Sequence, residues 1–158
     1  MDEEIAMLDV WHFSLTVSDL ERSIAFYKQL GLELLLVQEQ ANAYTSRLVG
    51  YENAHLKVAQ FIIPGQPRGV SSHDLELVEY VHPKGRRQKS DICNPGEAHL
   101  ALTVTDIHTR YERLKADGVH FFSPPTAITA VVNPGGYTCY FWDPDQIVLE
   151  IVQPPLRG

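Results

Sequence analysis

Apolar and polar residues alternate along several short segments of this chain, with the two-residue period of a half-buried strand. Residues 10–17 show this alternation and contain β-branched side chains. Strand-like segments follow at about 32–39, 55–63 and 74–81. The first half of the chain is therefore predicted to contain one strand, an intervening segment of about fifteen residues, and three further strands.

The intervening segment is predicted to be a helix. Asp19 is a suitable N-cap residue, because a carboxylate accepts hydrogen bonds from the first free backbone N–H groups of a helix. The apolar residues that follow have the spacing of one helical face: Leu20, Ile24, Tyr27 and Leu30. Gly31 lies where a glycine commonly follows the end of a helix. The predicted order is βαβββ.

The second half of the chain repeats this order. A strand is predicted over 98–104 and a helix over about 106–117, with Gly118 after it. Further strands are predicted near 120–122, 126–131, 136–142 and 147–152. The prediction is an α+β fold made of two βαβββ modules.

The two halves also share a pattern of histidine and glutamate. Residues 10–20 read V-W-H-F-S-L-T-V-S-D-L, and residues 97–107 read E-A-H-L-A-L-T-V-T-D-I. Each copy then ends in a strand that carries a glutamate, at 74–78 and at 148–152. A duplicated chain that keeps these residues offers four metal ligands to a shared centre. The four are His12, Glu76, His99 and Glu150.

Strand parity supports the same four residues, because side chains two apart in a strand share a face. A polar group on an apolar strand is costly to bury unless it is satisfied, and one divalent ion satisfies all four. Glu79 has the opposite parity to Glu76 and is expected to face the helix side or solvent. The remaining histidines are expected to be solvated surface residues: His55, His73, His82, His108 and His120.

Composition and charge limit the classes of function. The chain has 158 residues and is expected to form one domain over 1–158, with modules at about 8–82 and 97–153 and a linker at 83–96. A net charge of −7 argues against nucleic acid as a partner. No apolar run approaches the ~20 residues that span a bilayer, and no signal peptide is evident, so we expect a cytoplasmic protein without a membrane partner.

Three smaller features have two interpretations each. Cys93 and Cys139 lack a ligand-like spacing, and two reduced thiols are favoured over a disulfide. The basic run at 84–89 is either a solvated loop or a clamp for a substrate phosphate or carboxylate. Aromatic residues on the strands either line a pocket or belong to the core. They are Tyr80, Tyr140 and Trp142.

With its ligands on a doubled βαβββ, the chain resembles the vicinal oxygen chelate superfamily, and most of all its glyoxalase I and methylmalonyl-CoA epimerase branch. The resemblance runs from about residue 8 to 153. It includes S-D-L-E-R-S-I-A-F-Y at 18–27 and F-W-D-P-D at 141–145. It implies a curved mixed sheet around a metal-binding cup, built within one chain or across a homodimer.

The resemblance also implies the ligand set His12, Glu76, His99 and Glu150, around one divalent ion of Zn, Ni, Co, Mn or Fe. Dioxygenases and fosfomycin enzymes of the superfamily have a non-ligand at the position of Glu76. Two departures argue against glyoxalase I itself, since Thr16 and Tyr80 replace an arginine and an asparagine that contact glutathione. The second acid of the epimerases has no clear counterpart, with Glu52 as a candidate if the loop is shifted.

We therefore expect a metal-dependent isomerase, epimerase or lyase that stabilises an enediolate of a small α-hydroxy-ketone, α-keto or acyl-thioester substrate. Glu150 is the first candidate for the catalytic proton carrier and Glu76 the second. One alternative is a binding protein that sequesters a small molecule, as antibiotic-resistance proteins do. A less favoured alternative is an iron-dependent ring-cleaving dioxygenase.

Overall fold

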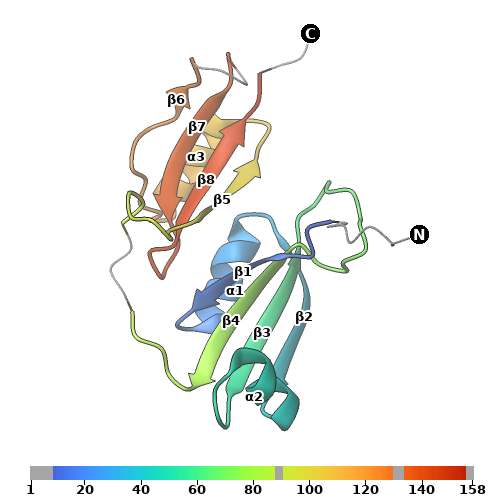
Figure 1. Ribbon diagram of the computed structural model, residues 1–158. Coiled ribbons are helices and arrows are strands. Elements are labelled where there is room, and N and C mark those ends of the chain that lie inside the picture. Colours follow the sequence, from blue (N-terminus) through green and yellow to red (C-terminus); the bar gives the residue numbers. More distant parts are fainter. Residues whose placement is uncertain (1–8, 88–90, 130–133, 156–158) are drawn as a thin grey trace, which may run out of the picture. The chain divides into compact units, whose positions relative to one another are not determined.

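The computed structural model describes residues 9–87, 91–129 and 134–155 (Figure 1). The chain divides into two compact units, Met1–Arg87 and Gln88–Gly158, and the division falls within the predicted linker 83–96. Each unit contains one copy of the repeat. Among the residues described, no helix has the length and apolar character needed to cross a bilayer.

The first unit is a four-stranded mixed sheet with two helices. Its elements are β1 (Phe13–Val17), α1 (Leu20–Gln29), β2 (Glu33–Gln40), α2 (Ala43–Val49), β3 (His55–Ile62) and β4 (Leu75–His82). The strand order is β1-β4-β3-β2, and β1 runs parallel to β4 while the other pairs are antiparallel. The first and last strands of the module are thus neighbours (Figure 1).

The second unit repeats this arrangement. Its elements are β5 (His99–Thr103), α3 (Ile107–Ala116), β6 (Thr126–Ala127), β7 (Tyr137–Trp142) and β8 (Val148–Gln153). The strand order is β5-β8-β7-β6, with β5 parallel to β8. The predicted α+β class and the two repeated modules are confirmed, and each module forms a four-stranded sheet of its own.

One face of each sheet packs against a helix and forms the core. In the first unit, Tyr27 of α1 and Phe61, Leu75 and Leu77 of the sheet have no exposed surface. In the second unit the fully or nearly fully buried side chains on this side are Ile107, Leu114, Phe141, Leu149 and Ile151. The alternate residues of the strands, among them Glu76 and Glu150, point to the opposite face.

The helices α1 and α3 begin where the sequence predicts, and a side chain on the last strand of each module accepts a hydrogen bond from the first residue of the helix. The N-cap carboxylates of Asp19 and Asp106 accept hydrogen bonds from the backbone N–H groups three residues later, both at 3.0 Å. The N–H of Leu20 donates to Glu79 on β4 at 2.9 Å. This confirms that Glu79 faces the helix side. In the second unit, the side-chain oxygen of Gln153 on β8 accepts a hydrogen bond from the N–H of Ile107, the first residue of α3, at 2.9 Å.

Three elements of the structure differ from the prediction. The helix α2 was not predicted; it is a short helix with Asn42 as N-cap and Gly50 in the left-handed conformation after it. The strand predicted at 120–122 is reduced to a single bridge between Phe121 and Phe141. The strand predicted at 126–131 is formed only at Thr126–Ala127, and 130–131 lie outside the described residues.

Candidate metal centre

The parallel pairing of β1 and β4 brings His12 and Glu76 to the same end of the first sheet. His12 immediately precedes β1, and Glu76 is the second residue of β4, where it pairs in register with Ser14. Both side chains are partly buried. Gln60 of β3 is the cross-strand partner of Glu76, and its amide donates to the Glu76 carboxylate at 3.3 Å.

A third residue, His73, joins this pair. Its Nε2 lies 3.0 Å from Nδ1 of His12 and 3.6 Å from Oε2 of Glu76. The two imidazole rings stack with their centroids 4.9 Å apart. The prediction that His73 is a solvated surface residue is wrong, because only 5% of it is exposed. It lies in the loop before β4, and its ring stacks on that of His12, which is distant in the sequence.

The surroundings of His73 favour its neutral form. Burial is the largest influence and lowers the pKa of His73, and the neighbouring His12 lowers it further. The carboxylates of Glu76 and Asp74 act in the opposite direction but do not outweigh these effects. A neutral imidazole keeps one nitrogen lone pair, which is the form that binds a metal ion.

Beyond the polar cluster, the same face of the first sheet becomes apolar. Leu56, Val58 and Val78 form a small buried cluster, and Val49 and Tyr80 pack against it. The ring of Tyr80 also meets Tyr51 edge to face at 6.2 Å. This face therefore offers imidazole and carboxylate groups at one end and an apolar wall at the other.

The second unit places His99 and Glu150 together in the equivalent position. Nε2 of His99 lies 3.1 Å from Oε2 of Glu150. The hydroxyl of Thr138 donates a short hydrogen bond to the other carboxylate oxygen. Burial, followed by the charge of Glu150 and a hydrogen bond to it, raises the pKa of Tyr140, so its hydroxyl stays protonated beside the carboxylate.

Aromatic rings continue this face of the second sheet. The ring of His99 meets Tyr140 edge to face at 5.2 Å. Phe122 packs against Tyr140 at 6.0 Å and against Trp142 at 4.0 Å. Tyr140 and Trp142 are both partly exposed and share the face of Glu150, so they border the His–Glu pair as well as packing together.

The donor atoms have the spacing that a divalent ion requires. With metal–ligand bonds of about 2.1 Å, neighbouring donors lie about 3.0 Å apart in an octahedral site and about 3.4 Å apart in a tetrahedral one. His12 and His73 are separated by 3.0 Å, His73 and Glu76 by 3.6 Å, and His99 and Glu150 by 3.1 Å. All three donors of the first unit lie within 4.8 Å of one another.

The predicted ligands are thus brought together as two pairs, one within each unit. Imidazole nitrogen and carboxylate oxygen suit zinc and the other first-row divalent metals. The convergence of all four residues on a single ion stays a prediction.

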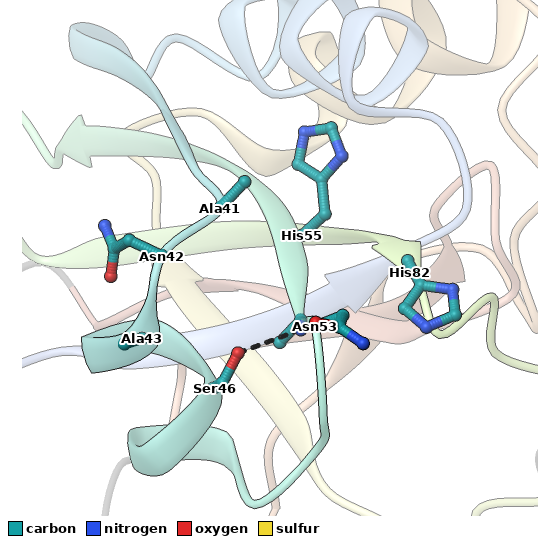
Figure 2. Close-up of a pocket in the computed structure, with 8 residues that line it drawn as sticks. Ala41, Asn42, Ala43, Ser46, Asn53, His55 and His82 are labelled. Carbon is teal, nitrogen blue, oxygen red and sulfur yellow. Dashed lines mark hydrogen bonds between the residues drawn. The ribbon is translucent and has the colours of Figure 1, made fainter.

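A separate pocket lies at the other end of the first sheet, around α2 (Figure 2). It is lined by Ala41, Asn42, Ala43, Ser46, Asn53, Ala54, His55 and His82. His82 is the last residue of β4, whereas Glu76 is near its start. His55 is already in contact with Glu39. The exposed positions of His82, His108 and His120 agree with the sequence prediction.

The cysteines and the basic run complete the predicted features. Cys93 and Cys139 are both free, the first exposed and the second buried. Lys84 lies 3.4 Å from Glu79 and also donates to the carbonyl oxygen of Ser18. Arg86 and Arg87 are exposed, and 88–89 lie outside the described residues, so the anion-clamp interpretation stays a prediction.

Comparison with known proteins identifies relatives over most of the chain. A 2-epi-5-epi-valiolone epimerase from Actinomyces sp. is 32% identical over 151 residues, which cover 92% of this chain and 79% of that protein. A lactoylglutathione lyase from Haemophilus influenzae is 27% identical over 158 residues and covers 92% of this chain and 93% of that protein.

Solved structures share the fold. A glyoxalase family protein from Bacillus cereus matches with a TM-score of 0.80 at 18% identity, over 96% of this chain and 97% of that one. The fosfomycin resistance protein FosX from Listeria monocytogenes, in complex with Mn(II), matches with a TM-score of 0.57 at 20% identity, over 96% of each chain. Divalent metal binding therefore occurs among proteins with this fold.

Residues 10–151 match the family described as Glyoxalase/Bleomycin resistance protein/Dioxygenase superfamily. This range includes nearly all of both modules and every predicted ligand. Together with the repeated topology and the His–Glu pair in each module, the match shows that this chain belongs to that superfamily.

Proposed function

We propose that this protein is a metal-dependent epimerase that moves a proton at the carbon next to the carbonyl of a small polyhydroxylated ketone. The observation that carries the proposal is the His–Glu pair in each module, in a chain that is 32% identical to a 2-epi-5-epi-valiolone epimerase. The name of that relative denotes a ketone whose configuration changes at one carbon. This is the α-hydroxy-ketone class among the predicted substrates.

A divalent ion would be held by His12 and Glu76 of the first unit and by His99 and Glu150 of the second. When bound, such an ion acts as a Lewis acid on the carbonyl oxygen and stabilises the enediolate that forms when the neighbouring carbon loses its proton. Two carboxylates and two neutral imidazoles balance its charge.

Glu150 is our first candidate for the group that carries the proton. Its carboxylate is held by the Thr138 hydroxyl on one oxygen and lies beside His99 on the other, so its direction is fixed before substrate arrives. A carboxylate that is already oriented toward the substrate carbon removes its proton at a lower cost in entropy. Glu76 is the second candidate. Its carboxylate accepts a longer hydrogen bond, from the Gln60 amide at 3.3 Å, so its orientation is less restricted than that of Glu150.

A lyase that acts on a glutathione adduct is a less favoured activity. Thr16 and Tyr80 occupy the positions of the expected glutathione contacts, and Tyr80 is packed against Tyr51 and the apolar cluster. An aromatic and apolar wall suits a compact ring better than a charged tripeptide.

The test is deuterium uptake from heavy water into cyclic polyhydroxy-ketones, followed by NMR with zinc, cobalt, manganese or no metal. Uptake next to the carbonyl is expected only with metal. Glu150→Gln should reduce it by on the order of 100-fold or more, the scale of a lost general base. Glu112→Gln on the exposed side of α3 is the matched control and should leave it unchanged.

Three other results would each contradict the proposal and favour a different function. Metal-independent binding of ligands without exchange in any ketone would favour the sequestering protein. Oxygen consumption with an aromatic diol after anaerobic loading with iron would favour the dioxygenase. Hemithioacetal turnover with glutathione would favour the lyase.

We further propose a cytoplasmic homodimer. The free thiols of Cys93 and Cys139 suit a reducing compartment. The edge strand β2 leaves Leu35, Leu36 and Val37 each nearly half exposed, and an apolar edge of this kind favours pairing. Light scattering is expected to give twice the mass of the chain, and a monomer at all concentrations would remove this part of the proposal alone.

A further inference from the structure

We propose that His73 is a ligand of the bound metal ion, so that the first unit alone supplies three donors, His12, His73 and Glu76. The inference rests on the proposed function for the presence of a metal. It adds a residue that neither the repeat nor the resemblance predicts, because the second module has no histidine at the corresponding position, Ile147, three residues before Glu150.

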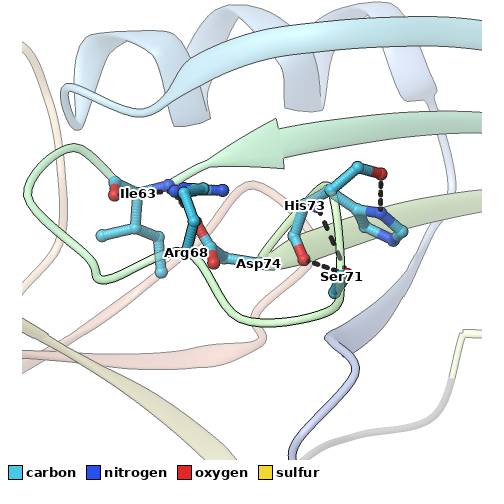
Figure 3. Close-up of polar contacts among 6 residues, drawn as sticks. Ile63, Arg68, Ser71, His73 and Asp74 are labelled. Atoms are coloured by element: carbon cyan, nitrogen blue, oxygen red, sulfur yellow. Dashed lines mark hydrogen bonds and ion pairs between the residues drawn. The ribbon is translucent and has the colours of Figure 1, made fainter.

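The backbone around His73 is fixed by a dense set of hydrogen bonds (Figure 3). The His73 N–H donates to the Ser71 hydroxyl oxygen, and this hydroxyl donates to the His73 carbonyl at 2.7 Å. The carboxylate of Asp74 accepts from the N–H of Ile63 at 2.7 Å and from Arg68 at 2.8 Å. The loop therefore presents His73 in one place, as preorganised ligands require.

The position of the side chain is also determined. His73 is 5% exposed, and its Nε2 points at His12 and Glu76 and not toward the sheet core. Its other nitrogen, Nδ1, lies 3.4 Å from the hydroxyl of Ser72. A metal-bound imidazole commonly donates its second ring N–H to a neighbouring oxygen, which leaves the facing nitrogen free to bind the ion.

A hydrogen bond between the two histidines does not by itself satisfy the cluster. A single proton between His12 and His73 satisfies those two nitrogens, while Oε2 of Glu76 accepts a long hydrogen bond from Gln60 at 3.3 Å and lies 3.6 Å from Nε2 of His73, beyond hydrogen-bond distance. The carboxylate thus has no hydrogen bond to the buried imidazole beside it, and a partly buried negative charge is costly unless it is paired. One cation bound by all three donors removes this cost, and the His12–His73 and His73–Glu76 separations of 3.0 and 3.6 Å are close to those around one ion.

The experiment uses the full chain with ¹⁵N-labelled histidine and a titration with Zn²⁺. The ring nitrogen resonances of the wild-type protein report each ligand directly, and histidine-to-glutamine variants assign them. We expect the His73 Nε2 resonance to shift in step with that of His12 and to stop shifting at one equivalent of zinc. His82, on the far end of β4, should not shift.

Zinc affinity, measured by competition with a colorimetric chelator, gives an independent readout. Substitution of a residue that only orients a ligand costs about 10- to 100-fold in metal affinity, and loss of a ligand should exceed the upper figure. We expect more than a 100-fold loss for His73→Gln and less than a twofold change for His82→Gln. If His73→Gln does not fold, the wild-type titration decides the question alone.

The outcomes separate the two proposals. Zinc binding that shifts His12 but not His73 overturns the inference and leaves the proposed function intact. Zinc binding through His73 without proton exchange in any ketone supports the inference and overturns the function. A wild-type chain that binds no divalent metal overturns both.

Discussion

Replacing Thr138 by valine is expected to weaken metal binding by about 10- to 100-fold without unfolding the protein. The Thr138 hydroxyl donates to Oε1 of Glu150, while Oε2 of Glu150 lies beside His99. Valine keeps the shape of the side chain and removes the donor. The carboxylate then loses the bond that holds its orientation toward the metal.

The magnitude follows from the charge on the acceptor. A hydrogen bond to an ionised group contributes about 1.5–3 kcal/mol, and about 1.4 kcal/mol corresponds to a factor of ten. The same range is typical of residues that orient a metal ligand. The hydroxyl also lies 3.2 Å from the carbonyl of Ile151, but it has one proton, and the carboxylate is the stronger acceptor.

The assay is competition for Zn²⁺ against a colorimetric chelator, with urea unfolding to establish that the variant is folded. Thr126→Val is the matched control, since Thr126 pairs with Thr138 across β6 and β7 but donates to the carbonyl of Pro124 instead. Equal zinc affinity in the wild type and both variants would refute the reasoning.

Two further predictions concern stability. Asp19→Ala should lower the free energy of unfolding by about 0.5–2 kcal/mol, because it removes the N-cap hydrogen bond from the N–H of Arg22. The control, Glu21→Ala, should lower it by only about 0.3 kcal/mol. Equal losses for the two variants in urea unfolding would contradict the capping role of Asp19. Burial raises the pKa of Cys139 from its ordinary 9.0 to about 11, with Glu150 adding to the effect. The unfolded chain thus releases this proton first, and stability should fall by about 2 kcal/mol as pH rises from about 9 to 11. Cys139→Ala should lack this part of the decline in urea titrations at pH 8, 9.5 and 11, and an identical decline would exclude the thiol.

Local signals in the sequence were enough for the repeat, the caps and the strand faces. The period of two in the strands places Glu76 and Glu79 on opposite faces, and the structure agrees, since Glu79 caps α1. Asp19 and Asp106 cap the two predicted helices for the same local reason. The strand faces and the Asp19 and Asp106 caps depend on residues that are close together in the chain.

Features that depend on distant contacts were missed. His73 precedes a strand in a loop that contains serine and glycine, and its buried side chain contacts His12, 61 residues away. The helix α2 has its signals in Asn42 and Gly50, but only Thr45 is buried along its seven residues, so no apolar stripe reveals it. Among the described residues of the strand predicted at 126–131, Thr126 and Ala127 form a strand, and they are the residues that pair with β7.

The parallel pairing of the first and last strands has a consequence for biosynthesis. At about 5–20 residues per second, the 61 residues between His12 and His73 take about 3–12 s to leave the ribosome. During that time the first histidine has no partner. The donor cluster therefore cannot form until most of the first module has been synthesised. Metal that binds afterwards stabilises a folded module against reopening, and it does so by mass action.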